Sequence, residues 1–273
     1  MSIPSGVLQS NLNRLSQELA ASAQHSQLPI DPSPLALKLS GGLFLAHSTA
    51  DEKFAEICEA QSLVSKSTFA ASGKMELEPT CDEAVLGTSN DVFFYVAPFR
   101  YPRTTCGFLF APTLELAHKD TGVATPFDSG GLIRHVMRQN PEELVQEFLA
   151  RHELPIPEHR QYLSHVMTTL FGKAEHYVEG IAQCNPCPIG LSGGDQRRWT
   201  HEVRIPGTVQ VEGNPHLAAI FAPIRATSDL RVEALLRWCD LMSVEKILFE
   251  TPKADDFAEL QRACLTYIKR ALY

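Results

Sequence analysis

The sequence predicts an α+β protein built on a mixed β-sheet. The segments with strand character are separated unevenly along the chain, and one of them alternates strictly between apolar and polar residues. The helical patterns lie early in the sequence, in a central insertion and at the C-terminal end. Separated strands with helices at the start and in an insertion favour an α+β architecture.

The composition is that of an ordinary globular protein, with 273 residues, 44% hydrophobic and 21% charged. The net charge of −8 means that a nucleic-acid substrate would need a local basic patch. No apolar run approaches the roughly 20 residues that span a bilayer, and no basic region precedes an apolar block at the N-terminus. Seven cysteines, scattered singly except for Cys184 and Cys187, suit a reducing compartment. We therefore expect a cytoplasmic protein with no membrane contact and no export signal.

The first 40 residues are predicted to form a helix and a linker. Apolar residues recur with helical spacing over residues 11–24, at Leu12, Leu15 and Leu19. Three prolines within residues 27–42 then mark a connector. We expect a single folded domain over residues 41–273.

The first half of this domain is predicted to contain one strand–helix unit and two further strands. An apolar strand at residues 43–46 precedes a helix from about residue 51, whose first residues are acidic, as the helix dipole favours. The polar residues 65–90 are expected to be loop. Residues 91–99 are rich in aromatic and β-branched side chains and predict a strong strand, and residues 105–117 predict a second.

The second half begins with a loop at residues 122–136 that leads into a helix, with Asp128 or Ser129 as its cap. A supporting role in an active site is the alternative for Asp128. Residues 141–180 are predicted to be a helical insertion between strands of the sheet. The remaining predicted elements are strands at residues 199–206 and 216–224, a strand or turn at residues 207–213, and helices at residues 229–242 and 255–272.

Glu202 is the first candidate for chemistry. The alternation in residues 199–206 places Thr200, Glu202 and Arg204 on one face, and a carboxylate in mid-strand goes against strand propensity. One interpretation is an edge strand with a solvated polar face. The other is a carboxylate presented into a cleft by a rigid strand, just after a loop rich in Gly and Pro.

The second candidate is the sequence His47-Ser48-Thr49 at the end of the first strand. A three-residue match is common by chance, and Thr49 would also suit a helix cap. The order of the surrounding segments makes the match informative. A helix and a Ser-Leu pair follow, then the aromatic strand "VFFYVAP", and much later a loop and a strand containing "HEVRIP".

That order resembles the ADP-ribosyltransferase fold in its His–Tyr–Glu branch, and within the branch it is most similar to DarT-like bacterial toxins that modify nucleic acid. The match covers about residues 43–223, with residues 141–180 as an insertion. It departs from the DarT-like pattern at Gln61-Ser62, where a Gly is usual. It also lacks the Arg of an Asn-Ala-Arg motif, because residues 65–90 contain no arginine. The resemblance implies a mixed, largely antiparallel split sheet.

The resemblance also implies that NAD is the ADP-ribose donor and Glu202 the catalytic residue. A carboxylate near the ribose stabilises the positive charge that develops as nicotinamide leaves, and it can help to remove a proton from the attacking group. An aromatic ring orients nicotinamide by stacking. The implied NAD-binding residues are His47, Ser48, Thr49 and Tyr95. Arg100 or Arg103, just past the aromatic strand, would replace the missing arginine, and we favour Arg100.

The target implied by the resemblance is a base in single-stranded RNA or DNA, and the protein would be a toxin or defence effector with an antitoxin protein as partner. Arg197 and Arg198 form the nearest basic pair to Glu202 and are the expected target-binding residues. A protein target remains an alternative. So does an inactive interaction module on the same fold, in which Glu202 is only a surface carboxylate.

A third alternative is a metal-stabilised binding protein built around Cys184 and Cys187. Their spacing suits zinc, and His176 and His201 are the available partners. No second close Cys or His pair stands at the spacing of a zinc finger, so we expect no metal site.

Overall fold

The structure is a computed structural model. It describes residues 5–22, 43–73, 82–96, 105–130, 145–171, 176–177, 200–250, 262–263, 266–267 and 270. Arg100, Arg197, Arg198 and the pair Cys184 and Cys187 lie outside the described residues, as does most of the predicted helix 255–272.

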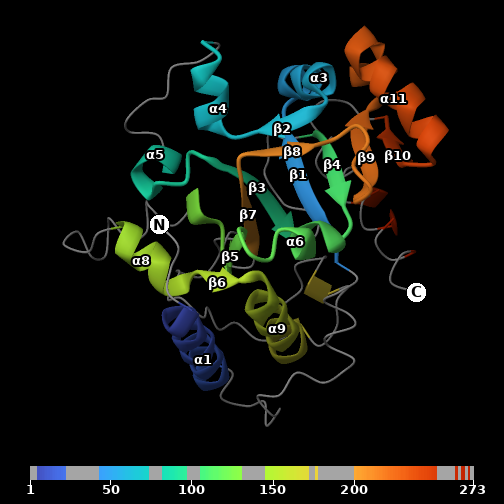
Figure 1. Cartoon of the computed structure of the whole chain (residues 1–273). Coiled ribbons are helices and arrows are strands. Elements are labelled where there is room, and N and C mark those ends of the chain that lie inside the picture. The colour runs from blue at the N-terminus through green and yellow to red at the C-terminus, as the bar shows by residue number, and fades with distance from the viewer. Residues whose placement is uncertain are drawn as a thin grey trace.

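A large mixed sheet forms the centre of the protein (Figure 1). Its strand order is β10-β9-β4-β1-β3-β7-β5-β6, and every neighbouring pair is antiparallel except the parallel pair β9 and β10. The α+β class with a mixed sheet is thus confirmed. The strands are β1 (Leu45–Thr49), β3 (Asp91–Val96), β4 (Cys106–Phe110), β5 (Val123–Thr125), β6 (Leu154–Pro155), β7 (Glu202–Pro206), β9 (Leu217–Pro223) and β10 (Glu245–Phe249).

Two further strands form a small separate sheet, β2 (Ser62–Val64) with β8 (Thr208–Gln210). Strand β10 was not among the predicted elements. Its two charged residues at the start obscure a strand that buries only Ile247 and Phe249. It pairs with β9 at one edge of the large sheet.

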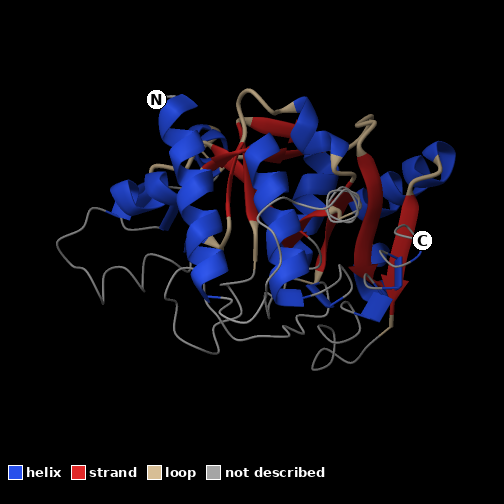
Figure 2. Ribbon diagram, turned by 90° about the horizontal axis from the view of Figure 1, so that it is seen from below, coloured by secondary structure: helices blue, strands red, loops and turns tan. Residues whose placement is uncertain are grey.

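The predicted N-terminal helix is α1 (Ser5–Ser22), and it belongs to the same hydrophobic core as the sheet. Leu12, Leu15 and Leu19 are buried there, as their spacing predicts. The predicted insertion contains α8 (Val145–His152), α9 (Ile156–Val166) and a π-helical turn (Met167–Phe171), with β6 between the two helices. Helices α1 and α9 lie side by side on one side of the sheet (Figures 1 and 2).

Helices α3 (Asp51–Ala60) and α11 (Leu230–Met242) pack against each other near the other end of the sheet. The ring of Phe54 in α3 contacts that of Phe108 in β4, with centroids 5.2 Å apart. Thr49 does not cap α3, because the cap position is Ala50 and no side chain bonds there. A short 3₁₀ helix (Ile224–Ser228) connects β9 to α11.

Several predictions on local structure were wrong. Strands β5 and β6 of the large sheet lie within residues 122–136 and 141–180, where the sequence predicted a loop leading into a helix and a helical insertion. Residues 65–90 contain two short helices, α4 (Lys66–Ala71) and α5 (Asp82–Leu86), and the hydroxyl of Ser65 caps the first by accepting from the backbone N–H of Thr68 at 3.3 Å. Strand β4 does not continue through residue 117. Pro112 follows it, lacks a backbone N–H for strand pairing, and starts α6 (Thr113–Ala117) with a helical φ of −57°.

The sheet opens between β1 and β3. Strand β1 pairs with β4 along its whole length, but within the described residues it pairs with β3 only at Leu45 and Ala46. Strand β3 remains paired with β7 from Asp91 to Tyr95. The sheet is therefore continuous in strand order, and over their described residues β1 and β3 are no longer paired beyond Ala46. Among the described residues, no helix combines the length and apolar character needed to cross a membrane.

Candidate functional site

Glu202 begins the central strand β7, which lies between β3 and β5. Its neighbours across the sheet are Tyr95 on one side and Thr125 on the other. Its side of the strand is not solvated, since Glu202 is 1% exposed and Arg204 is 3% exposed. The interpretation of an edge strand with a solvated face is therefore wrong.

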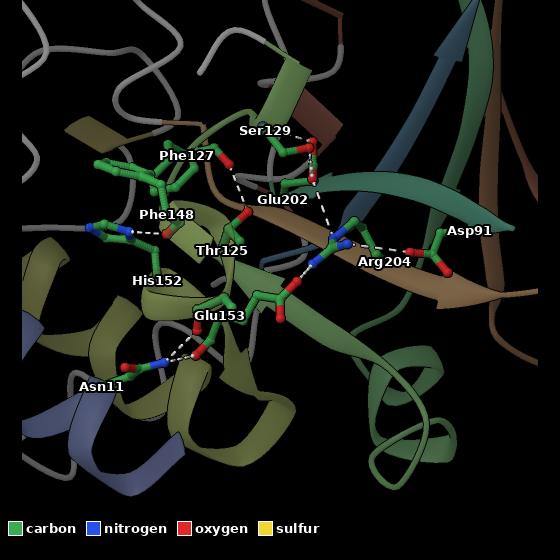
Figure 3. A network of polar contacts seen from close by, with 11 residues as sticks. Asn11, Asp91, Thr125, Phe127, Ser129, Phe148, His152, Glu153, Glu202 and Arg204 are labelled. Atoms are coloured by element: carbon green, nitrogen blue, oxygen red, sulfur yellow. Dashed lines mark hydrogen bonds and ion pairs between the residues drawn. The ribbon is translucent and has the colours of Figure 1, made fainter. Parts of the chain in front are cut away.

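The carboxylate of Glu202 is held by one residue through both of its oxygens (Figure 3). The hydroxyl of Ser129 donates to Oε1 at 2.6 Å, and the backbone N–H of Ser129 donates to Oε2 at 3.2 Å. Ser129 is itself fully buried. The sequence suggested Ser129 only as a helix cap, because a serine in a Gly-rich loop gives no sign of a distant partner.

Arg204 lies two residues after Glu202 and joins three carboxylates, shown in Figure 3. Its Nε lies 3.7 Å from Oε1 of Glu202 and its Nη1 lies 3.3 Å from Oδ2 of Asp91, while Nη2 pairs with Glu153. We call these four residues the Arg204 cluster. The carboxylates come from β3, from the turn between α8 and β6, and from β7, so the cluster ties together distant parts of the chain.

The electrostatics of the cluster favour a protonated Glu202. Burial raises its pKa most, and the negative charge of Asp128 raises it further. Arg204 and the two hydrogen bonds from Ser129 lower the pKa, which is left at about 8. Burial also raises the pKa of Asp91, against the opposing effect of Arg204. Glu202 is therefore mostly neutral at pH 7 in this arrangement.

The predicted NAD-binding residues are divided between the two faces of the sheet. Tyr95 is directly opposite Glu202, and its other neighbour is Ala46 in β1. Because side chains alternate along a strand, Ser48 belongs to the same face as Tyr95 and Glu202. His47 and Thr49 belong to the opposite face. The structure therefore brings together Tyr95, Glu202 and the strand that holds Ser48.

His47 lies where β1 and β3 separate. Its Nδ1 is 2.9 Å from the backbone carbonyl oxygen of Phe93, and its ring meets the edge of Phe94 with centroids 5.9 Å apart. A carbonyl oxygen only accepts, so Nδ1 must carry the proton of this bond. Burial lowers the pKa of His47. The ring is thus a neutral imidazole whose Nε2 is available as an acceptor.

A pair of buried histidines lies on the other face of β7, and sequence analysis missed it as a pair. Nε2 of His159 in α9 lies 2.9 Å from Nδ1 of His201, which directly precedes Glu202. Burial lowers the pKa of both rings, that of His159 to about 3. Two neutral rings sharing one proton fit this distance. No spacing in the sequence connects the two residues, which lie 42 positions apart.

The remaining predicted site residues are not placed. Arg100, Arg197 and Arg198 lie outside the described residues, and so do Cys184 and Cys187. In the part of the chain that the structure describes, no three His, Cys, Asp or Glu side chains are grouped to hold a metal ion.

Comparisons with known protein families, with curated proteins and with solved structures found no match to this chain.

Proposed function

We propose that the protein is an NAD-dependent ADP-ribosyltransferase with Glu202 as its catalytic carboxylate. The observation that carries the proposal is the placement of three distant motifs on the consecutive strands β1, β3 and β7. Tyr95 and Glu202 are direct neighbours across two of them. His47 lies at the point where the first two strands separate.

The buried charges support a functional site over a purely structural one. Removing a carboxylate from water is expensive, and one guanidinium faces three carboxylates in the Arg204 cluster. A pKa raised by burial together with a specific charged neighbour is typical of catalytic groups. An apolar residue in place of Glu202 would avoid that cost, so its presence in a central strand favours a chemical role.

The proposed reaction uses the ionised form of Glu202. The bond between C1′ of the ribose and the nicotinamide nitrogen breaks, and its electron pair leaves with neutral nicotinamide. Positive charge develops on the ribose, where a carboxylate stabilises it. A lone pair of the target attacks C1′, and the proton of the attacking group passes to Glu202 or to water.

Tyr95 and His47 have distinct roles in this proposal. The ring of Tyr95 stacks on nicotinamide and fixes its orientation beside Glu202. His47 lies on the opposite face, so a ribose hydroxyl of the same NAD would reach its free Nε2 where β1 and β3 separate, and would donate a hydrogen bond to it there. Because Glu202 is 1% exposed, NAD reaches it only after the atoms that cover it move, as in enzymes that close over their substrates.

The proposed target is a base in single-stranded RNA or DNA, which would make the protein a toxin or defence effector controlled by an antitoxin. Arg197 and Arg198, shortly before Glu202 in the sequence, would bind the target's phosphates. The net charge of −8 requires such a local basic site.

Incubation with NAD labelled in its adenine half tests both parts of this proposal. The enzyme is mixed separately with RNA, DNA and a protein extract, and the Glu202→Gln variant is the matched control. We expect label in a nucleic-acid pool with the wild type and none with the variant. Label found only in protein would mean that the target is a protein and not a nucleic acid. Intact NAD in all pools would favour an inactive interaction module, with Glu202 as a buried structural residue and not a surface carboxylate.

A further inference from the structure

We propose that Asp128 and Ser129 are positioning residues for Glu202. In this proposal Ser129 fixes the orientation of the carboxylate, and Asp128 opposes its negative charge. The inference rests on the proposed function and assigns a role to the loop after β5, for which the sequence favoured a helix cap.

The geometry of Ser129 is that of an orienting group. Its hydroxyl and its backbone N–H each bond a different oxygen of Glu202, at 2.6 and 3.2 Å. Two donors from one residue restrict rotation of the carboxylate about its last bond. Hydrogen bonds to a carboxylate strengthen when it ionises, so the same contact favours the form that the reaction needs.

The segment that holds Ser129 is anchored at Phe127, by the ring and by the backbone carbonyl oxygen of that residue. The Phe127 ring is fully buried in a small hydrophobic cluster with Leu86 and Leu149, separate from the main core. The hydroxyl of Thr125 donates to the carbonyl oxygen of Phe127 at 2.8 Å, as Figure 3 shows. A backbone fixed two residues before Ser129 keeps its donors at a constant position relative to β7.

Asp128 directly precedes Ser129, whose two donors bond the carboxylate of Glu202, so the charge of Asp128 stands close to that carboxylate. Asp128 is 3% exposed, and its Oδ1 accepts from the backbone N–H of Gly130 at 3.0 Å. Among the described residues, the charged or titratable groups that face Glu202 are Arg204 on its own strand, Tyr95 on β3 and Asp128 on the loop after β5. Asp91 and Glu153 act on it through Arg204.

Two nearly isosteric substitutions should move the titration of Glu202 in opposite directions. Ser129→Ala removes a donor to the carboxylate and should raise the pH of half-ionisation by about one pH unit. Asp128→Asn removes a like charge and should lower it by a similar amount. Ser129→Thr keeps the hydroxyl and should restore the wild-type value.

The titration is measured directly by carbon NMR of glutamate side-chain carboxyls, with the Glu202 signal identified by its loss in Glu202→Gln. A matched control is Ser65→Ala, which removes a buried serine hydroxyl near the other end of β7. That variant should not shift the Glu202 signal. Thermal unfolding of each variant shows that it is folded at the temperature used.

The same variants are then compared by the pH dependence of kcat/KM for nicotinamide release, whose acid limb reports the free enzyme's essential base. We expect this limb to move with the NMR titration, and kcat to fall in Ser129→Ala more than KM rises. The inference would be overturned if the pH of half-ionisation of Glu202 moved in the same direction in Ser129→Ala and Asp128→Asn, or moved in neither. Opposite NMR shifts without any nicotinamide release would support the positioning of Glu202 and overturn the proposed function.

Discussion

Glu202 shows how a single side chain combines a stability cost with a chemical role. The protein holds its carboxyl next to Arg204 and two donors from Ser129, yet burial and Asp128 keep its pKa near 8. A carboxylate that must stabilise positive charge in the reaction needs to be ionised. Because its pKa lies near neutral pH, Glu202 can lose its proton readily. This suits a group that needs its charge only when substrate is bound.

Stability should depend on pH through this residue. The pKa of Glu202 rises from an ordinary value of 4.5 to about 8 on folding. Between these values the folded chain keeps a proton that the unfolded chain releases, so the free energy of unfolding falls as the pH rises. The stabilising contribution is complete below pH 4.5 and is lost as the pH passes about 8. It amounts to about 4–5 kcal/mol at most.

Urea unfolding of the wild type and of Glu202→Gln at about pH 5, 7 and 9 checks this dependence. The glutamine cannot ionise, so the free energy of unfolding of the variant should increase relative to that of the wild type as the pH rises. Parallel curves would mean that Glu202 titrates at an ordinary pKa.

His47 should act on NAD binding and not on the chemical step. The proton on Nδ1 is committed to the carbonyl of Phe93, which leaves Nε2 to accept from a ribose hydroxyl. Loss of one such hydrogen bond in His47→Ala should weaken NAD binding by about 3- to 10-fold. Calorimetric titration with NAD measures the effect, and an unchanged dissociation constant would remove His47 from the site.

At the scale of elements, the contact between β1 and β4 depends on a residue without a side chain. Gly107 in β4 lies so close to β1 that an added Cβ would stand 2.0 Å from the carbonyl oxygen of His47 and 2.6 Å from the ring of Phe221. Gly107→Ala should therefore separate two strands of the core and displace His47. We expect a loss of at least about 1–3 kcal/mol in the free energy of unfolding.

Gly213→Ala is the matched control, since its added Cβ would meet no atom within 4 Å and only its φ of +78° is strained. It should lose about 1–2 kcal/mol and retain NAD binding. Equal effects in the two variants on stability and on NAD affinity would show that the close approach at Gly107 is unimportant.

The sequence predicted most elements, but not the contacts that decide the site. Apolar periodicity identified α1, and aromatic and β-branched residues identified β3, because both signals are local. Capping by Ser65 and the start of a helix at Pro112 were missed, and both depend on backbone geometry at one residue. The bonds of Ser129 to Glu202 span 73 positions, and no local pattern reports a contact of that range.

At the scale of the whole molecule, the Arg204 cluster connects the sheet to α1. Asn11 in α1 donates to the backbone carbonyl oxygens of Ala150 and Glu153, both at 2.9 Å, as Figure 3 shows for Asn11 and Glu153. The side chain of Glu153 in turn pairs with Arg204. The N-terminal helix thus supports the segment that holds one carboxylate of the cluster.

A chain that begins at residue 41 should consequently not fold stably, although the sequence placed a linker there. It lacks the buried side chains of Leu12, Leu15 and Leu19, each of which stabilises a core by about 2–5 kcal/mol. Circular dichroism during thermal unfolding measures the effect, with Leu15→Ala as the milder variant. A cooperative transition at the full-length temperature would show that residues 1–40 form a separate unit.

The central claim is that the protein transfers ADP-ribose from NAD with Glu202 as its catalytic carboxylate. The most direct test measures the rate of nicotinamide release from NAD by the wild type and by Glu202→Gln, together with the NAD affinity of both. The account predicts that the wild type releases nicotinamide, and that the variant binds NAD with similar affinity but releases nicotinamide about 10²–10³-fold more slowly. A variant that keeps more than about a tenth of the wild-type rate would contradict it, as would a folded wild type that does not bind NAD.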